Sequence, residues 1–149
     1  MPPIKELFQI TLPVRGYEID VYGHVNNAVY LQWLEQARWE WSRANQIGIE
    51  FENVLSVVRH LDLDFKHEVI FGDEVEISLW PRICKNTSVI VGAQIKIIKS
   101  DIQKNINQVA LNAQMVLALV EKGTKQKAPV PSKWRSFFPE HDPGETLAD

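Results

Sequence analysis

YEIDVYGHVNNAVYLQWLEQARWEWSRA, the stretch from residue 17 to residue 44, joins a polar loop to the strongest helical pattern in the chain. At about 100° of rotation per residue, one stripe of apolar side chains lies within about 60° of Tyr30. Its members are Tyr30, Trp33, Leu34, Ala37, Trp41 and Ala44. The stripe predicts an amphipathic helix with one buried face. We expect the helix to begin near Asn26 or Asn27, either of which can cap a first-turn N–H, and to end within residues 45–48.

The loop before this helix, residues 20–27, places a carboxylate, an imidazole and two amides beside a positively polarised helix N-terminus. A carboxylate such as that of Asp20 can attack a carbonyl carbon or deprotonate water, and helix amides can bind the developing oxyanion. Asp20 can instead cap a turn in its Asp-x-x-Gly loop. His24 can orient a water or protonate a leaving group, or it can be a structural hydrogen-bonding group.

The rest of the chain alternates apolar and polar residues with the period of two that is typical of half-buried strands. We expect strands over residues 8–14, 55–66, 75–79, 89–97 and 109–119. In the segment 55–66 the odd-numbered residues form the more apolar face, and the other face is mostly polar. One amphipathic helix among strands with one apolar face each predicts an α+β fold, in which an antiparallel sheet of about five strands wraps around a long central helix.

The length of 149 residues predicts one domain over residues 1–149. From residue 121 onward we expect an extended tail that frays from about residue 139. A net charge of −3 gives no electrostatic reason to expect nucleic acid or an anionic membrane as a partner. The chain has no signal-peptide pattern and no run of about eighteen apolar residues, so we expect a cytoplasmic protein. Cys84 is the only cysteine, which excludes an intrachain disulfide.

The motif Asp20-x-x-Gly23-His24-Val25-Asn26-Asn27, followed by Tyr30, Trp33-Leu34-Glu35 and Ala37-Arg38, resembles the signature of hotdog-fold acyl-CoA thioesterases of the 4-hydroxybenzoyl-CoA thioesterase superfamily. A weaker resemblance continues through residues 65–73 to residues 129–131. It implies a hotdog fold, hydrolysis of an acyl-CoA to free acid and CoA without a cofactor, and assembly into a homodimer or homotetramer.

The resemblance also implies roles for individual residues. Asp20 would be the nucleophile or general base, His24 would support it, and the amides at the helix N-terminus would form the oxyanion hole. Five residues would contact the substrate: Gly23, Val25, Asn26, Asn27 and Tyr30. Glu35 is a reserve catalytic candidate, because a helix carboxylate replaces the loop aspartate in some relatives. Its spacing from Arg38 also predicts a structural ion pair.

Two other functions stay open: a thioesterase that acts on acyl-carrier protein, and a hotdog protein that binds acyl thioesters without hydrolysing them. The enoyl-CoA hydratases of the same fold resemble Asp-x-Asn with a histidine five residues after the aspartate. Here Tyr22 and Val25 occupy those two positions, which disfavours a hydratase.

Two further patterns concern metals and assembly. His60, Asp62 and Asp64 share one strand face, but a charged strand face is ordinarily solvated, so we assign no metal and no cofactor. Trp39 points away from the apolar stripe of the helix, and a large aromatic ring there would be exposed in a monomer. We therefore expect a contact between subunits at Trp39.

Overall fold

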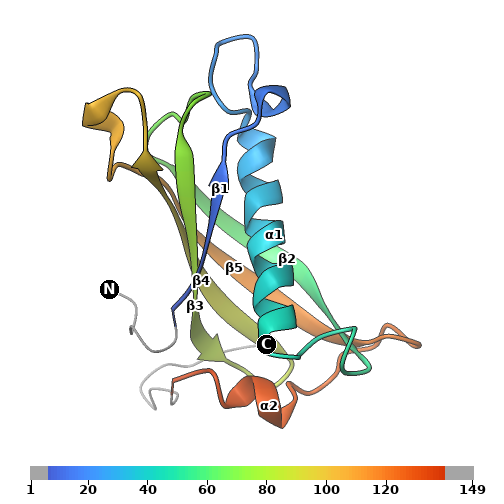
Figure 1. Cartoon of the computed structure of the whole chain (residues 1–149). Helices are drawn as coiled ribbons and strands as arrows, with labels where there is room; N and C mark the ends of the chain where they lie inside the picture. The colour runs from blue at the N-terminus through green and yellow to red at the C-terminus, as the bar shows by residue number, and fades with distance from the viewer. Residues whose placement is uncertain (1–6, 140–149) are drawn as a thin grey trace.

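In the computed structural model, which describes residues 7–139, one antiparallel sheet packs against a single long helix (Figure 1). The strands are β1 (Phe8–Pro13), β2 (Val54–Phe65), β3 (Glu74–Cys84), β4 (Ser88–Lys99) and β5 (Val109–Glu121), in the spatial order β1-β3-β4-β5-β2. The helices are α1 (Asn27–Ala44), α2 (Ser132–Arg135) and the 3-10 turns η2 (Gly16–Glu18) and η3 (Gln103–Asn105). The predicted α+β arrangement of one long helix and five strands is confirmed.

Helix α1 begins and ends where its sequence predicts. Asn26 is the N-cap, and its Oδ1 accepts a hydrogen bond from the N–H of Ala28 at 3.0 Å. After the last turn, Gln46 and Gly48 adopt positive φ angles of 54° and 89°, which break the helix. The predicted apolar stripe is buried except for Ala44 in the last turn, which is exposed. None of the helices within residues 7–139 is both long and apolar enough to cross a membrane.

Strand β2 contains a β-bulge that its alternating sequence did not reveal. The register against β5 shifts between Val58 and His60. Before the shift, the even-numbered residues Val54 and Val58 pack against the core. After the shift, the odd-numbered residues Leu61 and Leu63 do so. Our expectation of one uninterrupted alternation over residues 55–66 is therefore wrong, because an extra residue moves all later side chains to the opposite face. The side chain of Val57, on the face of β2 that points away from the core, is 48% exposed.

The segment after β5 is packed rather than extended. Trp134 in α2 is buried, and its ring contacts Trp41 of α1 edge-on with centroids 5.8 Å apart. Phe137 contacts the same Trp41 ring at 5.9 Å. The expectation of a wholly extended tail is therefore wrong for this segment, because its aromatic residues cover the C-terminal end of α1. The expected fraying concerns mainly residues 140–149, which lie outside the described part of the chain.

Three loops meet at the end of the molecule where α1 begins: residues 14–26, 66–73 and 100–108 (Figure 1). The first two are joined by backbone contacts. His24 forms a β-bridge with Ile70, and the N–H of Val25 donates to the carbonyl of Val69 at 2.8 Å. Gly72 has a φ of 101°, and a Cβ there would lie 2.9 Å from a carboxylate oxygen of Asp101. Glycine thus permits the third loop to approach the second.

Candidate active site

Residues 20–24 form a tight turn directly before α1. The N–H of Asp20 donates to the carbonyl of His24 at 2.9 Å, and the N–H of Gly23 donates to the carbonyl of Asp20 at 3.1 Å. Gly23 has a φ of 81°, a conformation that glycine adopts without strain. A β-bridge between Ile19 and Val25 closes the base of the turn. The sequence Asp-x-x-Gly therefore forms a hydrogen-bonded turn that holds Asp20 in the loop directly before α1.

The two oxygens of the Asp20 carboxylate have different surroundings. Oδ1 accepts hydrogen bonds from the N–H groups of Tyr22 at 2.9 Å and His24 at 3.4 Å. This is the turn-capping geometry that was the alternative to a catalytic role. Within residues 7–139, both hydrogen bonds that this carboxylate accepts go to Oδ1. One oxygen therefore orients the group, and Oδ2 stays available to a water or a substrate carbonyl.

His24 is paired with a residue from the neighbouring loop. Its Nε2 lies 2.8 Å from Oε2 of Glu68, and the two side chains are 42% and 55% exposed. The bridge between His24 and Ile70 holds the two loops together at the same point. Glu68 was not among the predicted site residues, because no local pattern links it to residues 20–24. It becomes a neighbour only when the end of β2 is placed beside α1.

Tyr30 lies in the first turns of α1 and is almost fully buried. Its ring contacts Trp33 and Phe65 edge-on, each with centroids 5.4 Å apart. The pKa of the Tyr30 hydroxyl is raised to about 12, mainly by burial; a hydrogen bond with the Val69 backbone opposes this rise, and the carboxylates of Glu68, Asp73 and Asp20 contribute to it. The hydroxyl is therefore protonated at neutral pH and can donate a hydrogen bond.

The N-terminus of α1 has few unoccupied amides. The N–H of Ala28 donates to the side chain of Asn26 at 3.0 Å, and that of Val29 donates to the Asn26 carbonyl at 2.8 Å. Asn27 is the first helical residue, so its N–H has no acceptor within the helix. Among the predicted substrate contacts, Asn27 and Gly23 are exposed, whereas Val25 lies in the hydrophobic core. The amide of Asn27 is the strongest candidate for an oxyanion donor at this helix end.

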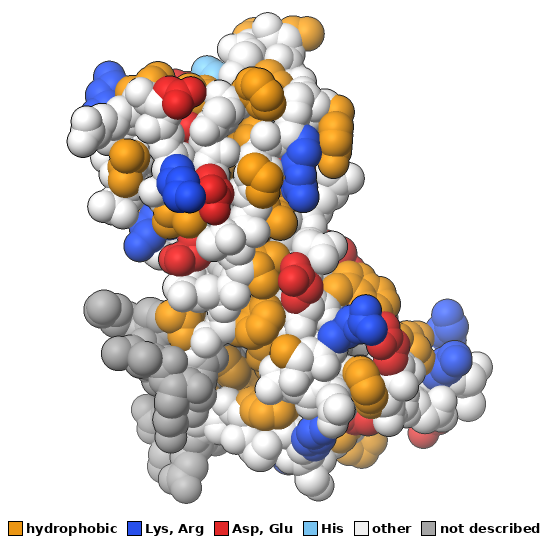
Figure 2. Space-filling model, in the orientation of Figure 1, with side chains coloured by type: hydrophobic (Ala, Val, Ile, Leu, Met, Phe, Trp, Pro, Cys, Tyr) orange, Lys and Arg blue, Asp and Glu red, His pale blue; other side chains and the backbone are white. Residues whose placement is uncertain are grey.

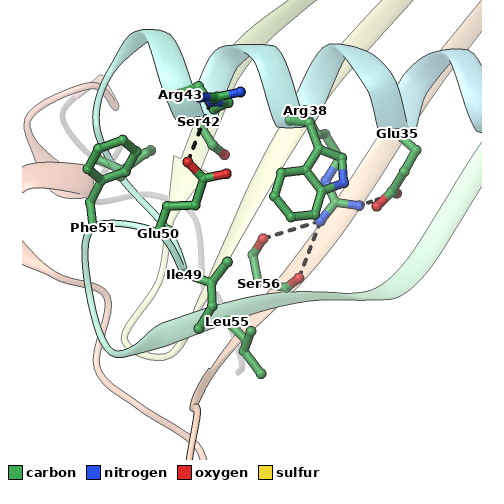
Figure 3. A pocket seen from close by; sticks show the side chains of 12 residues that line it. Glu35, Arg38, Ser42, Arg43, Ile49, Glu50, Phe51, Leu55 and Ser56 are labelled. Carbon is green, nitrogen blue, oxygen red and sulfur yellow. Dashed lines mark hydrogen bonds and ion pairs between the residues drawn. The ribbon is translucent and has the colours of Figure 1, made fainter.

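Glu35 is separated from this site along α1. Its Oε2 lies 2.7 Å from Nη1 of Arg38, as the spacing predicts, and Nη2 of Arg38 donates to the carbonyl and hydroxyl of Ser56 at 3.3 and 3.2 Å (Figure 3). Burial lowers the pKa of the Arg38 guanidinium, while Glu35 acts in the opposite direction. Both residues border a pocket between α1, residues 47–51 and the start of β2. The structure does not bring Glu35 together with Asp20.

Two buried carboxylates close to the site were also missed by the sequence reasoning. Asp73 is buried, and its Oδ2 accepts the N–H of Ile70 at 3.1 Å, which closes the turn before β3. Glu18 is buried against Trp33, whose Nε1 donates to Oε2 of Glu18 at 2.9 Å. For Asp73 the sequence did give a local indication, because the pair Gly72-Asp73 is typical of a turn. No pattern in the sequence indicated the second, because it depends on how the loop folds onto α1.

The surface around the site is rich in exposed apolar side chains, and Figure 2 shows hydrophobic patches at the end where the loops meet. The loops contribute Tyr17, Val21, Tyr22 and Phe71.

Within residues 7–139, no group of three or more histidine, cysteine, aspartate or glutamate side chains is arranged to hold a metal ion. His60 pairs with Asp62 at 3.3 Å on an exposed strand face.

Comparison with known proteins agrees with this architecture. The model of the thioesterase-like superfamily matches residues 14–138. The chain is 36% identical to the long-chain acyl-CoA thioesterase FadM of Escherichia coli over 73 residues, which are 47% of this chain and 54% of FadM. The chain thus spans about half the length of this relative.

Solved structures show the same fold. PA2801, described as a putative thioesterase from Pseudomonas aeruginosa, superimposes with a TM-score of 0.76 at 24% identity, over 86% of this chain and 95% of that one. A thioesterase from Thermus thermophilus, solved with coenzyme A and zinc, superimposes with a TM-score of 0.71 at 23% identity, over 87% of this chain and 89% of that one. At these identities the likeness concerns the fold.

Proposed function

The chain belongs to the thioesterase-like superfamily, as its motif predicted, and we propose that it hydrolyses an acyl-CoA thioester to a free acid and CoA. The observation that most supports this activity is the Asp20 carboxylate. Two backbone amides donate to its Oδ1, while Oδ2 accepts no hydrogen bond within residues 7–139, in the loop that leads into α1. The partial similarity to FadM supports a CoA substrate. Hydrolysis of this kind needs an oxygen nucleophile and a donor for the oxyanion, and both are available here.

Two routes are open to Asp20. In one, Oδ2 attacks the thioester carbonyl carbon, the CoA thiolate leaves, and water then hydrolyses the mixed anhydride. In the other, Oδ2 takes a proton from water, the resulting hydroxide attacks the same carbon, and the C–S bond breaks so that the CoA thiolate leaves. In both routes we propose that the N–H of Asn27, at the positive end of the helix dipole, stabilises the oxyanion.

The remaining motif residues have supporting roles in the proposal. His24, oriented by Glu68, supplies a proton or a hydrogen bond to the departing thiolate. The neutral hydroxyl of Tyr30, buried in the first turns of α1, serves as a polar group at the edge of the site. Gly23, Asn26 and Asn27 surround the thioester, and Val25 fixes the loop from the core side.

We further propose that two copies pair through β2, the long edge strand. β2 has twelve residues, pairs with β5 on one side and contains no proline, so its other side offers free backbone groups. β1, the other edge strand, has six residues and ends at Pro13. Exposed apolar side chains flank the β2 edge, among them Val57, Phe65 and the predicted contact residue Trp39. Antiparallel pairing would place the pocket of Figure 3 in one copy near the Asp20 end of the other.

A substrate panel tests the proposed activity. Aromatic, short, medium and long acyl-CoAs, and acyl thioesters on a carrier protein, are incubated with the protein while released thiol is measured. We expect at least one acyl-CoA to be hydrolysed at a rate that is proportional to protein concentration. Turnover of carrier-protein thioesters alone would replace the proposed substrate class. Saturable binding without thiol release from any substrate would show a binding protein instead.

A further inference from the structure

We infer that Glu18 is a positioning residue for the proposed reaction, because its buried carboxylate clamps the loop that holds Asp20 to helix α1. This inference rests on the proposed thioesterase activity. Glu18 is 5% exposed. Its Oε1 accepts the backbone N–H of Arg15 at 2.7 Å, and its Oε2 accepts the indole N–H of Trp33 at 2.9 Å. Each oxygen therefore has a donor from a different part of the chain.

The backbone of Glu18 completes the clamp. Its carbonyl accepts the N–H of Asn26 at 2.9 Å, and its N–H donates to the carbonyl of Arg15 at 3.0 Å. Arg15 lies where the loop begins, and Asn26 is the N-cap of α1 where the loop ends. One residue thus joins the entry, the exit and the helix, and the turn from Asp20 to His24 projects from between these fixed points. A shift of the turn relative to α1 would break hydrogen bonds to a buried carboxylate.

Trp33 extends the effect of Glu18 to a second site residue. The indole is 2% exposed, and its ring meets the Tyr30 ring edge-on, 5.4 Å between centroids and 72° between planes. The hydrogen bond to Glu18 fixes the orientation of the indole. The indole in turn packs against the Tyr30 ring and limits how that ring can move. Glu18 therefore positions Asp20 through the backbone and Tyr30 through Trp33.

Glu18→Gln is the most informative substitution because it preserves shape. The carboxylate offers an oxygen to each of two N–H donors, whereas the amide offers one oxygen and one NH₂ group. In the variant, the NH₂ group must face the donor of either Arg15 or Trp33, which forces the loop to move. Adding Trp33→Phe removes the indole donor, so the amide oxygen can turn to the N–H of Arg15. The double variant should therefore recover what the single variant loses.

The experiment compares wild type, Glu18→Gln, Trp33→Phe and the double variant, with Glu121→Gln as a control at an exposed glutamate. Glu121 accepts a hydrogen bond from Thr124 at the opposite end of the sheet. Hydrolysis of the best acyl-CoA gives kcat and KM, and hydrogen–deuterium exchange gives the protection of residues 20–26. Because small displacements of a catalytic group cost large factors in rate, we expect Glu18→Gln to lower kcat by about 10-fold to 100-fold, with KM within about threefold. Exchange in residues 20–26 should become faster.

The outcomes separate the inference from the proposed function. A double variant whose kcat is clearly higher than that of Glu18→Gln supports a clamp that acts by hydrogen-bond matching. Wild-type kcat and exchange in Glu18→Gln would overturn the inference, and so would a double variant that is no better than the single one. If Glu18→Gln does not fold, the Trp33→Phe variant tests the inference instead. Wild-type kcat and wild-type exchange in Trp33→Phe would then overturn the clamp. A wild-type protein that releases no thiol would refute the proposed function, and the exchange data would still test the clamp itself.

Discussion

Nε2 of His24 lies 2.8 Å from Oε2 of Glu68, although the two residues belong to different loops. Both side chains are substantially exposed, so this pair adds at most about 1 kcal/mol to stability. The main effect of the pair is on the position of the imidazole. The pair occupies Nε2 and leaves Nδ1 for other partners. Pairing with Glu68 thus orients the His24 ring relative to the Asp20 turn.

Glu68→Gln tests this orientation. The amide keeps an acceptor for His24 but loses the charge, so we expect kcat to fall by about threefold to tenfold while the melting temperature changes by less than about 2 °C. Glu74→Gln is the control, since Glu74 forms another ion pair at the surface, with Lys99 at 3.5 Å. Equal activity of the two variants would show that the His24 pair has no role in turnover.

Asp20→Asn tests the central carboxylate. The asparagine Oδ1 can still accept the N–H groups of Tyr22 and His24, so the turn and the melting temperature should be preserved. The negative oxygen needed for attack or proton removal is lost. We expect thiol release to fall at least about 10²-fold, equivalent to roughly 2.7 kcal/mol of barrier, while acyl-CoA binding survives. Activity within a few-fold of wild type would exclude Asp20 as the catalyst and direct attention to Glu35.

The raised pKa of Tyr30 predicts how the stability of the protein changes at alkaline pH. Its pKa of about 12 in the folded protein exceeds the value near 10 of an unfolded tyrosine, so the folded state retains a proton that the unfolded state releases. The associated stability is fully present below pH 10 and is lost as the pH rises towards 12. Chemical denaturation between pH 9 and 12 should show a smaller loss of stability in Tyr30→Phe than in wild type. Parallel losses would contradict the raised pKa.

The assembly prediction concerns the β2 edge. Light scattering at micromolar concentration should show a dimer or a tetramer. Val57→Lys places a charge beside the free edge of β2 and should shift the protein towards monomer with reduced thiol release. Thr11→Lys, on the exposed face of the opposite edge strand, is the control and should leave the assembly intact. A wild-type monomer with full activity would refute pairing through β2.

Metal independence is the last prediction. The proposed nucleophile, proton donor and oxyanion donor are all side chains or amides of this chain, so dialysis against EDTA should leave thiol release unchanged. A loss of activity that zinc restores would instead implicate a metal. The exposed face formed by His60, Asp62 and Asp64 would then be the first place to substitute.

Local chemistry determined much of this fold. The apolar stripe from Tyr30 to Trp41 and the cap at Asn26 specify α1, because helical spacing and capping act within a few residues. Strand alternation located all five strands in the same way. The motif from Asp20 to Asn27 identified the family, and its glycine at position 23 matches the positive φ of the turn. These features need no information from distant parts of the chain.

Only the tertiary structure decided the rest. The bulge between Val58 and His60 depends on the register against β5, and the docking of Trp134 depends on the surface left by Trp41. Glu68 and Glu18 look like ordinary surface carboxylates in the sequence. They become site neighbours because β2 returns beside the start of α1 and because the loop folds over Trp33. Such contacts join residues far apart in the chain, and the spacing of side chains along a strand or helix holds no information about which distant group they will meet.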